Sequence, residues 1–192
     1  MSVSLLTLAV VGTLGLLWSI AGGYAVPGSA LAMKPHFLVS LVSTLILAMA
    51  HSFIMFFLIA TGVEMKDMEK EHGWGDTFRR RTVALKGRSF PLMTSALLLV
   101  ITNFILGAAT HTKVLPPLVH EALSWLTFAV CAATLWREYQ VLAANNRLIG
   151  EAGLRRSSRT VAHTPLGPTP GSRLNWTKGP GAAAGRARED GS

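Results

Sequence analysis

Four long apolar runs separated by short polar segments are the main feature of this sequence. They cover residues 5–24, 37–63, 90–110 and 118–136, and Glu121 is the only formally charged residue within them. A run of about 20 apolar residues is long enough to cross roughly 30 Å of hydrocarbon as an α-helix. The pattern therefore predicts an all-α integral membrane protein, built as a bundle of four transmembrane helices.

Two of these runs continue into polar segments that are also compatible with a helix. Residues 64–71 after the second run contain Glu, Lys, Asp and Met, and neither Gly nor Pro occurs before Gly73. The fourth run is followed by a similar stretch from Arg137 to about Ile149, before Gly150 and Gly153. Such residues favour helix continuation. We therefore expect both helices to extend beyond the membrane as cytoplasmic helix extensions.

The segments between the runs are predicted to be loops. Residues 26–35 contain Pro27, Gly28 and Pro35, which indicate a short external connection between the first two helices. Residues 73–88 are polar and basic without a spanning run, and are expected to form a surface loop, or a loop with a short interfacial helix. Pro91 suits the first turn of the third helix.

The first apolar run has a second interpretation, a signal peptide. Small residues follow it, but no Lys or Arg precedes it and it exceeds the usual length of about 7–15 apolar residues. We therefore expect a retained helix.

The C-terminal segment differs in composition from the rest of the chain. From Ser157 onward it is rich in Ser, Thr, Pro, Gly and Arg and shows no periodicity. This composition predicts a four-helix transmembrane domain at 1–156 and a disordered tail at 157–192. The sequence Leu174, Asn175, Trp176 is the apolar patch of this tail, so it is the candidate docking point for a partner subunit or the membrane interface.

Composition and charge narrow the functional classes. Hydrophobic residues make up 50% of the chain and charged residues 15%, which is too apolar for an ordinary soluble domain. The net charge is +8, but basic residues flank the apolar runs, which indicates anionic lipid headgroups rather than nucleic acid as the partner. Cys131 is the single cysteine, so an intrachain disulfide, a redox pair or a cysteine-based zinc site is excluded.

The distribution of Lys and Arg predicts the orientation in the membrane. The three segments between the runs hold one, seven and one of them in chain order, and nine follow the fourth run. Positive residues accumulate on the cytoplasmic side. We therefore expect both termini to be cytoplasmic, in a bacterial inner membrane or its equivalent.

His51 is the first candidate for a functional residue, because an ionisable group near the centre of a membrane helix is costly and usually faces a partner. One interpretation is a neutral imidazole hydrogen-bonded to Ser or Thr on the next helix. The alternative is a ligand to a b-type haem or copper, or a residue that contacts a quinone or transfers a proton. In each case the side chain should face another helix rather than lipid.

Two helical faces carry small and polar residues that could pack together. In the fourth run they recur at spacings of three and four: His120, Ser124, Thr127, Cys131 and Thr134. In the second run they are Ser40, Thr44, Ala48 and His51. Counting from the outer helix ends places His51 and Cys131 at similar depth, whereas Glu138 is assigned to the end of its helix.

A third group lies at the outer ends of the helices and is a candidate metal site. It contains three imidazoles and one carboxylate, which are ligands for copper or zinc: His36, His111, His120 and Glu121. No HxxxH or HExxH spacing joins them. Ordinary interfacial histidines are therefore the competing interpretation.

Motifs for catalysis are missing from the sequence, since it has no phosphate-binding loop, no GxSxG motif and no acidic pair within the runs. We therefore expect a small membrane subunit of a larger assembly, such as an electron-transfer or respiratory complex, with a structural role and without a catalytic site of its own. The alternative is a protein that binds haem b, copper or quinone through His51 or the outer histidines.

Overall fold

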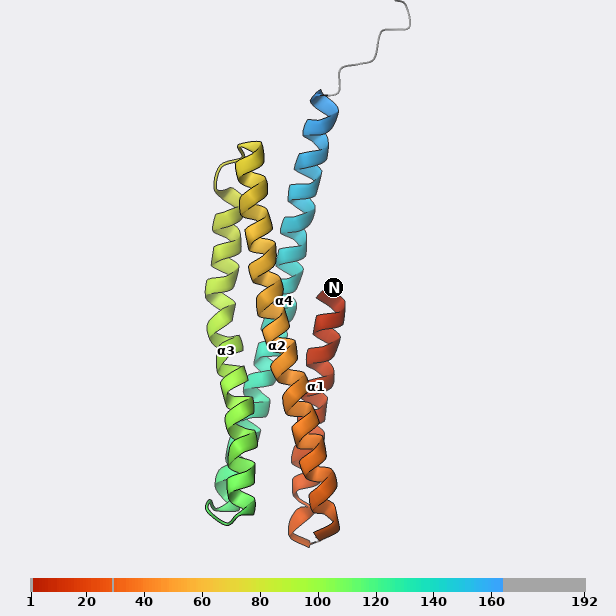
Figure 1. Cartoon of the computed structure of the whole chain (residues 1–192), viewed down its shortest axis with the longest axis vertical. Coiled ribbons are helices and arrows are strands. Elements are labelled where there is room, and N and C mark those ends of the chain that lie inside the picture. The colour runs from red at the N-terminus through yellow and green to blue at the C-terminus, as the bar shows by residue number, and fades with distance from the viewer. Residues whose placement is uncertain (1, 29, 164–192) are drawn as a thin grey trace, which may run out of the picture. The chain divides into compact units, whose positions relative to one another are not determined.

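A computed structural model describes residues 2–28 and 30–163 of the chain, and in these residues the only regular structure is helical (Figure 1). Its elements are α1 (Ser2–Gly23), the short 3-10 helix η1 (Val26–Gly28), α2 (Ala30–His72), α3 (Thr77–His111) and α4 (Pro117–His163). Each of the four α-helices is long and apolar enough to cross a membrane. The prediction of an all-α chain with four potential spans is therefore confirmed.

Helix α2 is longer than its apolar run at both ends. It continues without a break to His72, as expected from its polar but helix-forming residues. At the other end it begins at Ala30, so Pro35 lies inside its first turns rather than in the preceding connection. Pro35 is the sixth residue of α2, just beyond the first four residues whose N–H groups have no helical acceptor, so it removes one backbone hydrogen bond from this helix.

The predicted loop at residues 73–88 is wrong for all but its first residues. Helix α3 already begins at Thr77, and Pro91 therefore lies well inside this helix rather than at its start. The physical reason is tertiary packing, since Phe78 is only 5% exposed and belongs to an apolar cluster with α2 and α4. Amphipathic packing can maintain a helix across a segment whose composition indicates a loop.

Helix α4 also exceeds its predicted end, because it continues through Gly150 and Gly153 to His163. Each glycine costs about 1 kcal/mol relative to alanine in a helix. Packing offsets this cost, since Leu148 and Ala152 are buried against α2 and α3. Residues 157–163 are thus helical rather than part of a disordered tail, and residues 164–192, with the 174–176 patch, lie outside the described residues.

The chain divides into two compact units, Met1–Arg155 and Arg156–Ser192, and the packing described below belongs to the first. Its buried apolar side chains form three clusters along the bundle. The outer cluster draws on all four helices: Leu16, Ile20, Leu47, Ala96, Val100 and Cys131. The middle cluster also joins all four: Ala9, Ala50, Ile54, Leu58, Met93, Val141 and Leu142. The third cluster lacks α1: Met65, Trp74, Phe78, Leu148 and Ala152.

Helix α1 packs closely on α2 through glycine. A Cβ atom added at Gly12 would lie 2.8 Å from Cγ of Leu47, and one at Gly15 would meet the Ser43 hydroxyl. Small residues of this kind permit close helix contacts. Figure 1 shows that α1 begins partway along the longer helices, where Asn146 of α4 donates a hydrogen bond to Ser2 at 2.9 Å.

The turn between α2 and α3 is closed by a buried carboxylate. Glu69 is 5% exposed, and its Oε1 accepts hydrogen bonds from the backbone N–H of Phe78 at 2.5 Å and of Arg79 at 3.3 Å. Gly73 and Gly75 provide the positive φ angles of +63° and +77° that the turn requires. A carboxylate in this position satisfies helix N-terminal donors and interacts favourably with the helix dipole.

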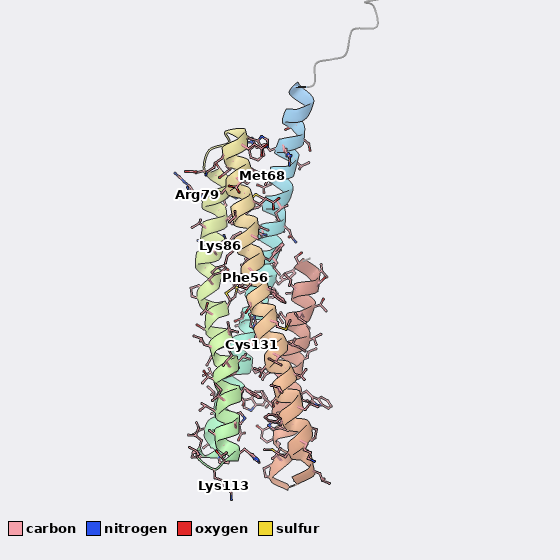
Figure 2. All side chains as sticks on the ribbon, in the orientation of Figure 1. Phe56, Met68, Arg79, Lys86, Lys113 and Cys131 are labelled. Atoms are coloured by element: carbon pink, nitrogen blue, oxygen red, sulfur yellow. The ribbon has the colours of Figure 1, made fainter. Side chains whose placement is uncertain are left out.

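The extended ends of α2, α3 and α4 are held together around this turn. Trp74 stacks on His72 with ring centroids 4.9 Å apart, and the Arg155 guanidinium lies 5.2 Å from its ring centroid. Arg81 donates hydrogen bonds to Glu151, which lowers the pKa of that carboxyl group. This exposed ion pair contributes little to stability compared with the apolar cluster. Figure 2 shows Met68 and Arg79 at this end and Lys113 at the opposite one.

Candidate functional site

His51 of α2 and Glu138 of α4 form a buried pair inside the bundle. The distance between His51 Nδ1 and Glu138 Oε1 is 2.6 Å, and both side chains are 0% exposed. The expected inward orientation of His51 is thus confirmed. Its partner is a carboxylate rather than the expected Ser or Thr hydroxyl, and the assignment of Glu138 to a helix end was wrong.

The pair lies at a depth where apolar side chains from all four helices surround the bundle axis. Its neighbours along α2 and α4, Ala50 and Val141, belong to the middle cluster together with Ala9 of α1. Glu138 precedes Asn146, which contacts the start of α1, by eight residues, or about 12 Å along a helix. The two ionisable groups are therefore well inside the segment that α1 covers.

Few other titratable groups are near the pair. Helix α1 has no charged residue and no histidine, and α3 has none between residues 90 and 110. On α4 the nearest are Tyr139, which is exposed, Arg137, whose Nη1 donates a hydrogen bond to Gln140 at 3.0 Å, and Cys131 in the outer cluster. The charge of the His51–Glu138 pair must consequently be balanced within the pair itself.

This requirement determines how many protons the pair holds. A single buried charge costs several kcal/mol, whereas a hydrogen-bonded pair without net charge avoids most of this cost. Imidazolium with carboxylate, and imidazole with carboxylic acid, are both neutral as pairs and differ only in the position of one proton. At rest we therefore expect the pair to hold one proton, shared along the 2.6 Å contact between His51 and Glu138, and to carry a net charge only while that proton is away.

A second buried polar contact lies two helical turns further along α4. Asn145 is 1% exposed, and its Oδ1 accepts a hydrogen bond from the Thr61 hydroxyl of α2 at 3.2 Å. Exchanging the amide O and N would reverse the roles of the two residues but leave the contact in place. Helices α2 and α4 therefore face one another through polar groups at two successive levels.

Both levels contain buried polar atoms that lack a hydrogen-bond partner among the described residues. These are His51 Nε2, Glu138 Oε2 and Asn145 Nδ2. Rotating the Asn145 amide would satisfy the nitrogen through Thr61 but leave the oxygen unpaired. Buried groups of this kind usually interact with internal water or take part in function.

The polar face of α4 is present as predicted, but it continues further. Ser124 donates to Asn103 of α3 at 3.1 Å, and Thr127 and Thr134 donate to carbonyls of their own helix at 2.7 Å. The same spacing of three and four then leads from Thr134 to Glu138. Extending this periodicity past Trp136, where the fourth apolar run ends, leads to Glu138 and Asn145 from the sequence alone.

The predicted depth of Cys131 was incorrect. Cys131 is buried in the outer cluster with Leu47 and Val100, whereas His51 meets Glu138, seven residues further along α4. Seven residues correspond to about 10 Å of helix. The predicted inward face of α2 is also partly wrong. Ser43 and Leu47 are buried more fully than Ser40 and Thr44, which were predicted to face the bundle.

The four outer residues proposed as metal ligands do not form one site. No three His, Cys, Asp or Glu side chains in the described part of the chain are arranged to hold a metal ion. His36 donates from Nδ1 to the Ser19 carbonyl at 3.1 Å, and Glu121 accepts a hydrogen bond from Tyr24 at 2.7 Å. His120 packs against Gly107, and His111 is exposed at the end of α3.

The residues around His51 do not favour the haem hypothesis either. The imidazole is completely buried, its Nδ1 contacts Glu138, and the other histidines lie near helix ends or beyond the spans. A second axial histidine at this depth is therefore missing from the residues that the structure describes. The arrangement is better suited to holding a proton than to holding a porphyrin.

Comparison of the chain with protein-family models, with curated proteins and with solved structures finds no match. Function is therefore argued from the geometry of the site.

Proposed function

We propose that this chain is a multi-pass membrane protein, a small subunit of a larger membrane assembly, in which the His51–Glu138 pair binds and releases a proton. The observation that carries this proposal is the 2.6 Å contact between two ionisable side chains, each 0% exposed, among apolar helices. Ionisable residues at membrane depth are typical of proton relays in pumps and transporters. An electron-transfer complex is one kind of assembly that requires a site for binding and releasing protons.

The surface of the bundle supports insertion into a membrane. Many large apolar side chains on all four helices point away from the core and remain more than 40% exposed. Examples are Trp18, Leu38, Phe56, Leu98, Ile105, Leu118 and Leu126. Soluble monomers rarely expose continuous apolar surfaces of this extent. Lipid is therefore the medium that we propose for the apolar part of the helices.

A role within a larger assembly is supported by the side chains and surfaces of the bundle rather than by a catalytic site. The described residues contain one ionisable pair at membrane depth and no metal-binding group. Beyond the first two clusters, α2, α3 and α4 continue past the start of α1 and carry exposed charged residues such as Arg79 and Arg81. This extension offers a contact surface for a partner subunit.

The proposed orientation of the helices in the membrane can be tested separately. Because seven Lys and Arg lie between the second and third apolar runs but one between the third and fourth, Gly75 should be cytoplasmic and Lys113 external. Reporter fusions at these two positions measure this directly. The opposite result at both positions would reverse the proposed orientation and leave the helix bundle unchanged.

Infrared spectroscopy of the lipid-reconstituted protein tests the proton-binding role. A change of pH should alter bands of a protonated carboxyl group and of the imidazole ring together, because the two groups share one proton. Glu138→Gln should remove the carboxyl band and shift the imidazole signal. Glu121→Gln, which alters a carboxylate at the outer end, serves as the matched control and should retain both.

Two outcomes would contradict the proposal. One is a spectrum in which no band assigned to His51 or Glu138 changes across the pH range in which the protein remains folded. The other is a Soret band in the purified protein that disappears in His51→Ala, which would favour the haem hypothesis instead.

A further inference from the structure

We infer that the α2–α3 seam, the surface marked by Gly62 and Lys66 of α2 and by Arg79 and Lys86 of α3, binds the phosphate of an anionic phospholipid. Lys86 is the central residue of this site. The inference concerns a surface away from the His51–Glu138 pair, and it does not depend on the proton-binding role. It requires only that the apolar part of the bundle lies in a membrane.

Lys86 reaches from α3 to the backbone of α2 at Gly62. A Cβ atom added at Gly62 would meet the Lys86 ammonium nitrogen and would lie 2.9 Å from Cγ2 of Thr82. A larger residue at position 62 would therefore displace the lysine side chain. The missing side chain of Gly62 thus provides the space in which this ammonium group lies.

The Lys86 ammonium has no carboxylate or hydrogen-bond acceptor as partner among the described residues. Its side chain is half-buried, and this burial lowers the pKa of Lys86. Moving a cation out of water costs free energy unless a counterion is near. An anion from outside the protein would supply this counterion and stabilise the charged lysine.

The position of Lys86 along the bundle corresponds to the headgroup layer of a membrane. Lys86 precedes Phe90, the first residue of the third apolar run, by four residues, or about 6 Å along a helix. Gly62 is the last residue but one of the second run. Figure 2 shows Lys86 beside α2, between the levels of Arg79 and the lipid-exposed Phe56. The headgroup layer on each side of a bilayer is about 5–7 Å thick, so lipid phosphates lie at this level.

On α2 the charges near the seam are basic. Lys66 lies one turn beyond Gly62 on the same face and is exposed. Three acidic residues of the extension fall on other faces of the helix: Glu64, Asp67 and Glu71. Glu69 does share the face of Gly62, but it lies about 10 Å further along. Its carboxylate already accepts hydrogen bonds from the backbone at the start of α3.

On α3, Arg79 lies two turns before Lys86 on the same face. Its carboxylate partner is Asp76, with Nη1 and Oδ1 3.7 Å apart and both side chains more than half exposed. Such a pair contributes little to stability, so Arg79 can exchange it for another anion. The seam therefore presents three cations: Lys66, Arg79 and Lys86.

Towards the membrane the α2–α3 seam continues as apolar surface. Ile59 lies one turn before Gly62 and is 41% exposed, and Phe90 lies one turn after Lys86 and is half-buried. A free phosphate would contact only the cations, whereas a phospholipid would place its phosphate there and its acyl chains along the apolar part. Basic sites between transmembrane helices on the cytoplasmic side are typical of anionic headgroup binding.

Native mass spectrometry of the full-length protein in a neutral detergent tests the site. We expect phosphatidylglycerol to bind more tightly than phosphatidylcholine. Lys86→Gln should weaken binding of phosphatidylglycerol by at least about fivefold, which corresponds to about 1 kcal/mol for one lysine at the headgroup layer. Gly62→Ala should weaken it as well, without removing a charge, because the added methyl group displaces the ammonium group.

Arg88→Gln and Gly87→Ala are the matched controls. Arg88 is exposed on the opposite face of α3, two residues from Lys86, and a Cβ atom added at Gly87 would meet nothing within 4 Å. Both variants should leave the affinity for phosphatidylglycerol within about twofold of the unaltered protein.

Equal binding of the two lipids would overturn the site, and so would unchanged binding of phosphatidylglycerol in both Lys86→Gln and Gly62→Ala. Inorganic phosphate and polyglutamate, each added without lipid, test the other anions. If either bound as tightly as phosphatidylglycerol and depended on Lys86, the seam would be a site for free phosphate or for an acidic partner segment, and the phospholipid would be refuted. None of these results would alter the infrared bands of the His51–Glu138 pair, which test the proton-binding role separately.

Discussion

His51→Leu should lower the free energy of unfolding by about 3–5 kcal/mol, because it leaves the carboxylate of Glu138 buried without its partner. Removing the other partner, by Glu138→Leu, should lower the free energy of unfolding by less, about 1–3 kcal/mol, because a lone imidazole can remain neutral and loses only a hydrogen bond. Denaturant unfolding in detergent micelles measures both values. Ser52→Leu, at the neighbouring half-buried position, is the matched control and should change stability by much less.

The double variant His51→Leu/Glu138→Met distinguishes a coupled pair from two independent polar residues. Replacing both members of a buried pair by apolar residues of similar volume is often neutral or stabilising. The double variant should therefore be more stable than His51→Leu alone, with a coupling energy of more than about 1 kcal/mol. Additive losses would show that the two side chains do not act as a unit.

Recovery of stability in the double variant would also explain why the pair points to function. An apolar core at this depth would fold at least as well as the observed one, since Ala50, Ile54 and Val141 already surround the site. Such a recovery would mean that the His51–Glu138 pair contributes little net stability compared with apolar residues. It would therefore support the proposed proton-binding role.

Glu69→Ala is the second substitution with a large expected effect. It should lower the free energy of unfolding by about 3 kcal/mol. The carboxylate is 5% exposed and accepts hydrogen bonds from the backbone of Phe78 and Arg79 at the start of α3. Its removal leaves these donors without an acceptor and removes a favourable charge from the helix N-terminus. Glu71→Ala, at an exposed position two residues later, should have little effect.

Hydrogen exchange locates the effect of Glu69→Ala. The amides of Phe78 and Arg79 should lose protection in this variant, together with the turn that contains Trp74, whereas the middle of the bundle should be unchanged. Unchanged protection at these two amides would show that Glu69 does not cap α3 in solution.

The number and approximate position of the helices were determined by the sequence alone. Each apolar run has about the length needed to form a spanning helix or more, and the charged residues after Val63 favour helix without help from distant residues. The inward orientation of His51 was predictable for the same reason, since an imidazole exposed to hydrocarbon loses its hydrogen bonds. These properties depend on local composition, which can be read residue by residue.

Tertiary structure decided the start of α3 and the identity of the buried His51–Glu138 pair. Residues 77–88 resemble a loop in composition, and they are helical because Phe78 packs against α2 and α4 while Glu69 caps the helix. His51 and Glu138 are 87 positions apart, and only the axial register of α2 against α4 brings them together. That register results from the packing of many side chains at once, so counting residues from the helix ends selected Cys131 instead, about 10 Å away.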